Sequence, residues 1–222
     1  MADKLDELPL FLLHTVLFPH ALVQLHVFET RYRELVRDCL AADKPFGIVL
    51  IRSGSETGDG AEPYLVGTAV RIKKVHTFDD GRMDIQVQGE GRFRIRSLEE
   101  GGSYLVGHVE PVLEHPIEDS EEAEELVQLA REEFESFVQR QFSQQEFSVQ
   151  VVFPPDPQAL SFTIANLLQM ENIDKQRLLE TTDTLDRLRD LLPIMRQQLF
   201  EATPPTYYQL TSEELREWIL PN

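Results

Sequence analysis

The chain has 222 residues, with 39 acidic and 21 basic side chains and a formal net charge of -18. A charge of this sign disfavours a nucleic-acid platform, which needs clustered Lys and Arg, and adhesion to an anionic membrane surface. Hydrophobic residues make up 41% of the sequence, which is too many for a wholly disordered chain. We therefore predict a folded protein of one large domain or two small ones that does not act at a membrane.

The cysteine content and the N-terminal sequence indicate the cellular compartment in which the protein acts. The single cysteine, Cys39, excludes an intramolecular disulfide and a thiolate cluster, and a free thiol is typical of a reducing compartment. The N-terminus is acidic and lacks the pattern of a signal peptide, and no apolar run approaches the ~20 residues that span a bilayer. We predict a soluble, cytoplasmic protein.

Residues 1–114 have mostly the pattern of strands. The expected strands are the apolar or alternating runs Pro9–Leu13, Leu22–Val27, Phe46–Ile51, Tyr64–Val75, Met83–Ser97 and Tyr104–Val112. Asp79-Asp80-Gly81 predicts a hairpin turn, and Gly89-Glu90-Gly91 predicts a bulge or turn between strand halves. Ser53–Gly60 is expected to be a mobile loop. One helix, from about Thr30 to Ala42, is predicted by apolar residues at 3- and 4-residue spacing. Many short strands with one inserted helix predict a small, partly closed β-barrel.

Residues 115–204 have a helical period and predict a bundle. They lie in the part from 115 to 222 that carries a net charge of -13, against -5 for residues 1–114. Asp119 is expected to cap a helix that ends near Phe142, and Asp156 caps the next, with Pro157 at its first position. Further helical stretches are Leu160–Met170, Lys175–Thr181 and Asp183–Phe200, the last with an expected kink at Pro193.

The C-terminal extension, residues 205–222, contains a capping box at Thr211–Glu214 that predicts a last short helix with Trp218. The predicted organisation is thus a barrel subdomain at 1–114, a helical subdomain at 115–204 and this extension. The fold class is α+β.

A search for catalytic motifs finds none. The sequence has no Gly-Lys pair, which a phosphate-binding loop requires, and no Gly-x-Ser-x-Gly elbow. Cys39 lies on the apolar face of its helix and is interpreted as a small buried hydrophobe. His14, His20 and His26 recur at every sixth residue but show no chelating spacing. We therefore predict no enzyme activity, no metal and no cofactor.

Two groups of residues are candidates for binding. Arg92, Arg94 and Arg96 alternate along a strand, so they share one face that could contact an anion or RNA. The interpretation that we favour is a solvated face neutralised by acidic helices. The apolar N-terminal segment is mostly core by composition, but a residual apolar groove there would dock an unfolded or extended polypeptide.

Eight short segments follow one another in a specific order. They are Leu8–Pro19, Leu25–Tyr32, Phe46–Leu50, Val66–Arg71, Asp80–Arg82, Gly89–Ile95, Ala165–Leu168 and Lys175–Glu180. The series resembles the N-terminal, substrate-binding domain of Lon protease over roughly residues 8–200. His20 stands where many members have Gly, so the turn there is expected to differ.

The resemblance implies a PUA-like β-barrel followed by an α-helical bundle, with a role in recognising substrates. The ATPase loop and the Ser–Lys protease pair have no counterpart in a chain that stops at Asn222. We therefore expect a free-standing, non-catalytic polypeptide- or protein-binding module, such as an adaptor or regulator of proteolysis. The candidate contacts are Phe18, Pro19, His20, Phe28, Arg31 and Tyr32. The alternative is a PUA-like barrel that binds a small ligand or RNA through Arg92, Arg94 and Arg96.

Overall fold

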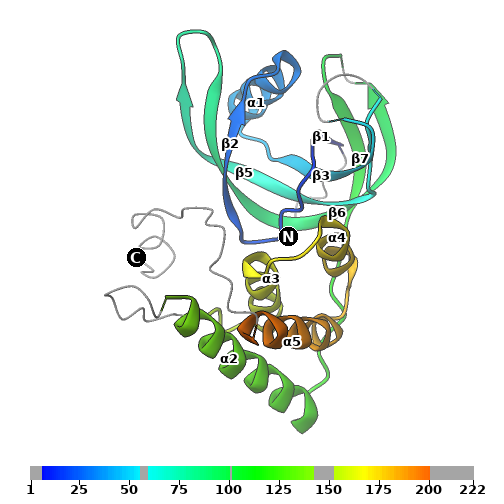
Figure 1. Ribbon diagram of the computed structural model, residues 1–222. Helices are drawn as coiled ribbons and strands as arrows, with labels where there is room; N and C mark the ends of the chain where they lie inside the picture. The colour runs from blue at the N-terminus through cyan, green and yellow to red at the C-terminus, as the bar shows by residue number, and fades with distance from the viewer. Residues whose placement is uncertain (1–6, 56–59, 101, 143–152, 201–222) are drawn as a thin grey trace. The chain divides into compact units, whose positions relative to one another are not determined.

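A computed structural model describes residues 7–55, 60–100, 102–142 and 153–200 (Figure 1). Part of the predicted 53–60 loop and the whole of the predicted extension at 205–222 lie outside the described residues. The chain divides into two compact units, residues 1–115 with 165–182 and residues 116–164 with 183–222. The first unit holds the strands and the second holds most of the helices, which confirms the α+β class.

One mixed sheet forms the body of the first unit. Its strands are β1 (Glu7–Leu13), β2 (Leu22–Val27), β3 (Phe46–Ser53), β4 (Glu62–Pro63), β5 (Val66–Thr77), β6 (Met83–Glu100) and β7 (Leu105–Pro111). They are ordered β1-β7-β6-β5-β3-β4, β2 pairs with β6, and a parallel β1–β3 pairing links the series into a ring. The strands of this ring are not spaced evenly around an axis, so the predicted barrel is not confirmed.

The β5–β6 hairpin extends beyond the rest of the sheet, with β2 beside it (Figure 1). Its turn is the predicted one, because Gly81 has a φ of 82° and donates its N–H to the carbonyl of Phe78. The predicted bulge is also present. Ala69 pairs with Gly91 and Val70 with Gly89, which leaves Glu90 as the extra residue.

Helix α1 (Thr30–Ala42) covers the core of this unit and has the predicted bounds. Tyr32, Leu35, Val36 and Cys39 form its buried face, at the spacing that one helical face requires. They pack against a cluster of buried side chains from the strands. Burial raises the pKa of the Cys39 thiol to about 11, which confirms its interpretation as a small buried hydrophobe.

Helix α4 (Asn172–Glu180) also belongs to the first unit, although residues 165–182 were expected in the helical subdomain. Side chains attach it to strand and loop backbone. The amide of Asn172 donates to the carbonyl of His14 at 2.5 Å, and the amide of Gln176 donates to that of Val66 at 3.0 Å. Both bonds join residues far apart in the chain, so local periodicity predicts the helix but not its packing partner.

The second unit contains α2 (Glu121–Phe142), the first part of α3 (Pro157–Leu167) and α5 (Thr184–Phe200). Asp156 caps α3 as predicted, accepting a hydrogen bond from the Ala159 N–H at 2.7 Å. The predicted cap of α2 is wrong, because Ser120 Oγ, and not Asp119, accepts from the Ala123 N–H. None of the described helices is long and apolar enough to cross a membrane.

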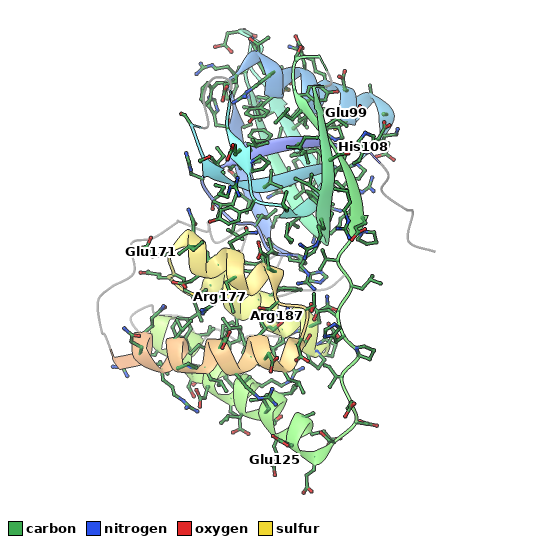
Figure 2. The ribbon with its side chains drawn as sticks, turned by 90° about the vertical axis from the view of Figure 1, so that its right-hand side faces the viewer. Glu99, His108, Glu125, Glu171, Arg177 and Arg187 are labelled. Carbon is green, nitrogen blue, oxygen red and sulfur yellow. The ribbon has the colours of Figure 1, made fainter. Side chains whose placement is uncertain are left out.

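Arg187 is fully buried within the second unit (labelled in Figure 2). Its Nε donates to Ser161 Oγ at 2.8 Å, and its guanidinium lies 4.0 Å from the centre of the Phe162 ring. A buried cation without such contacts would be strongly destabilising. The hydrogen bond and the ring contact of Arg187 therefore stabilise the packing of α5 on α3.

Candidate functional site

Three of the six predicted polypeptide contacts are buried. Phe18, Pro19 and Tyr32 all lie in the interior of the first unit. Tyr32 stacks on Phe11 with ring centres 3.8 Å apart, and its hydroxyl accepts from the Leu12 N–H at 3.2 Å. These side chains are therefore part of the core and do not present a docking surface.

Two of the other three have local structural roles. Arg31 is partly exposed, forms an ion pair with Glu29 at 3.1 Å and lies 4.5 Å above the Tyr32 ring. His20 is exposed and has a φ of 67°, a conformation that favours glycine. The turn at His20 therefore has the backbone geometry that a glycine adopts most easily.

Phe28 is the candidate that the structure places on the surface, with 53% of its area exposed. Its ring is 6.1 Å from that of His26, which is 6.2 Å from Phe78, and His76 lies edge-on to Phe78 at 4.7 Å. We call these four rings, His26, Phe28, His76 and Phe78, the hairpin aromatic surface. They come from the end of β2 and from the β5–β6 hairpin.

Strand register explains why these rings meet. Asp84 in β6 is directly opposite His26 in β2 and directly opposite His76 in β5, so the three side chains form a row on one face. Phe28 and Phe78 come two residues after the histidines, just beyond the ends of β2 and β5, and the ring distances place them beside His26 and His76. Sequence reasoning found Phe28 but missed both histidines, because their proximity depends on the pairing of three strands.

The charges around this surface are partly neutralised. Arg82 pairs with Asp80 at 2.6 Å and lies 5.8 Å above the Phe78 ring, and hydrogen bonds from Arg82 lower the pKa of the Asp80 carboxyl. Asp84 accepts a 2.6 Å hydrogen bond from His26 Nδ1. Within the described residues, Asp84 has no Arg or Lys partner.

The three alternating arginines do not form one solvated face. The Arg92 side chain is 1% exposed, forms an ion pair with Glu114 at 2.5 Å and donates to the carbonyls of Leu179 and Thr181. Arg96 is exposed and pairs with Glu110. The favoured solvated interpretation is therefore wrong for Arg92, and burial keeps this guanidinium from contacting an anion at the surface.

The described part of the chain offers little for catalysis or metal binding. Within it, no three His, Cys, Asp or Glu side chains are arranged to hold a metal ion. The thiol of Cys39 is buried, and its raised pKa keeps it protonated rather than nucleophilic.

The first unit is built on a mixed sheet, and comparison with known proteins identifies the family of the chain. The model of the ATP-dependent protease La (LON) substrate-binding domain matches residues 7–197. The chain belongs to this family, as the ordered series of segments predicted.

Individual relatives agree with this assignment. The Lon protease of Syntrophus aciditrophicus is 30% identical over 90% of this chain and 26% of that protein. The Lon protease of Escherichia coli K12 is 28% identical over 87% of this chain and 25% of that protein. The chain thus spans about a quarter of the length of these relatives.

Two solved structures have the same fold. A Lon N-terminal domain protein from Xanthomonas campestris is 29% identical, with a TM-score of 0.61 over 84% of this chain and 97% of that one. The N-terminal domain of the Mycobacterium avium complex Lon protease has a TM-score of 0.65 over 86% of this chain and 98% of that one. At 21% identity, the second likeness concerns the fold alone.

Proposed function

We propose that this chain binds unfolded or extended polypeptide and serves as a substrate-recognition module for proteolysis. Family membership supports the class of function, since the matching model describes a substrate-binding domain. The match does not extend to an ATPase or protease domain, so the proposal is a non-catalytic role without a cofactor. An adaptor or regulator acting in the reducing cytoplasm is the form of this role that we favour.

The observation that carries the proposal is the exposure of Phe28 within the hairpin aromatic surface. Phe28 is 53% exposed and lies beside other aromatic rings, and clustered exposed apolar side chains are typical of interaction surfaces. Neighbouring rings enlarge the surface, and aromatic side chains dominate the energetics of protein interfaces. Polypeptide segments that expose apolar side chains are suitable partners because any of them can pack on these rings.

The test measures binding to a permanently unfolded probe, reduced and carboxymethylated α-lactalbumin. Phe28→Ser is expected to weaken binding roughly tenfold, because it removes one of the two phenylalanine rings on which the polypeptide would pack. Ile173→Ser is the matched control, since Ile173 is 58% exposed on α4 of the same unit, outside β2 and the β5–β6 hairpin. Equal binding by the two variants would refute this location, and no binding by the unmodified protein would refute the function.

A further inference from the structure

The hairpin aromatic surface has an unusual electrostatic centre. Asp84 lies in the row between His26 and His76, and Phe28 and Phe78 flank the row. Its side chain is 52% exposed, and its hydrogen-bond partner is the imidazole of His26. An exposed carboxylate in one row with aromatic rings is a chemical combination that recognises cations, because both attract positive charge.

Three arginines of the first unit have partners other than Asp84. Arg82 pairs with Asp80, and Arg31 pairs with Glu29. Arg33 donates to the carbonyl of Asp80 and to the hydroxyl of Thr30. Lys74 in β5 comes next to His76 on the same face of the sheet, and it lies opposite Gln86 in β6. Asp79 lies in the exposed turn. The position of Arg82 over Phe78 shows that a guanidinium fits above these rings.

We propose that the hairpin aromatic surface selects polypeptide segments in which a Lys or Arg adjoins an aromatic side chain. The aromatic side chain packs on Phe28 and Phe78, and the cation takes the place between the rings beside Asp84. The charge of -18 on the whole chain favours the same partners, because it attracts basic segments at long range. This inference rests on the proposed function and specifies its substrate class.

The test uses three fluorescein-labelled unstructured peptides, with repeated Phe-Lys, Phe-Glu or Ser-Lys pairs, and reads fluorescence anisotropy. The unmodified protein is expected to bind the Phe-Lys peptide more tightly than the other two peptides. Asp84→Asn keeps the size of the side chain and weakens binding of this peptide roughly threefold to tenfold.

Glu7→Gln is the matched control, because it removes one exposed carboxylate from β1, which pairs with β3 and β7 and not with the hairpin. Equal binding of the Phe-Lys and Phe-Glu peptides, or an effect of Asp84→Asn no larger than that of Glu7→Gln, overturns the inference and leaves the proposed function standing. Failure of both Phe-containing peptides to bind overturns both.

Discussion

At the scale of single residues, the first unit uses one arginine as a buried structural cation. Arg92 has the same alternating position as Arg94 and Arg96, yet it is buried against Glu114 and two carbonyls. Burial of a charge is tolerated only where hydrogen bonds replace the lost water. The same alternation in the sequence therefore produces residues with opposite roles.

Replacing Arg92 by Ala is expected to lower the free energy of unfolding by about 3 to 5 kcal/mol, because Glu114 and both carbonyls lose their partner. Arg96→Ala removes an exposed ion pair and should have little effect on stability. Urea titration of both variants measures the difference. Similar losses for the two would contradict the structural role of Arg92.

The thiol of Cys39 should react only when the chain opens. Its pKa is raised to about 11, so at about pH 8 the native protein holds it as a buried thiol, whereas an unfolded cysteine is partly ionised. Iodoacetamide labelling, followed by mass spectrometry, should therefore be slow in buffer and fast in urea. Since the pKa is higher in the folded state than in the unfolded state, the contribution of Cys39 to stability is lost as the pH rises from the ordinary pKa of 9.0 towards about 11. Rapid labelling of the folded protein would contradict the buried environment.

At the scale of elements, the bulge in β6 brings this strand close to the segment that precedes β2. The N–H of Gly89 donates to the carbonyl of Ala21, and its carbonyl accepts from the N–H of His20. A Cβ at Gly89 would lie 2.5 Å from the carbonyl oxygen of Phe18, whereas a Cβ at Gly91 meets nothing within 4 Å. The backbone approach at the bulge thus has room for glycine alone.

Gly89→Ala is expected to destabilise the protein by about 1 to 3 kcal/mol, since backbone atoms must move to accept the methyl group. Gly91→Ala, two residues along the same strand, should change stability by less than about 1 kcal/mol. Thermal unfolding of the pair provides the comparison. If Gly91→Ala were the more harmful change, the register assigned to the bulge would be wrong.

Helix α2 provides a second test at this scale. Ser120→Ala removes the side chain that accepts from the Ala123 N–H and should cost about 1 kcal/mol. Asp119→Ala changes the neighbouring residue, which the sequence had indicated as the cap, and should cost little. Chemical denaturation distinguishes the two, and a larger loss for Asp119→Ala would restore the original prediction.

At the scale of the whole molecule, the sequence predicts local elements well and their long-range pairing poorly. Thr30–Ala42 and Leu22–Val27 have the predicted bounds because each carries a full period of apolar residues. The two-residue strand β4 is too short for any period to reveal. Residues 165–182 join the strand-containing unit through bonds such as that from Gln176 to the Val66 carbonyl, which no local pattern indicates.

The candidate site shows the same limit. Phe28 could be proposed from the apolar N-terminal segment, but Phe18 and Tyr32 have similar patterns and are buried. What distinguishes them is the pairing of β2 with β6 and of β6 with β5, which places His26 and His76 on either side of Asp84. Exposure and neighbourhood thus depend on contacts between strands that are distant in the chain.

Photo-crosslinking tests the central claim, that polypeptide is recognised at the hairpin aromatic surface, most directly. A photoreactive benzoyl-phenylalanine replaces Phe28 in one variant and Ile173 in another, both exposed in the first unit. Each variant is irradiated with reduced, carboxymethylated α-lactalbumin. We expect abundant adducts from position 28 and few from position 173. Equal yields from the two positions, or adducts from position 173 alone, would contradict the account.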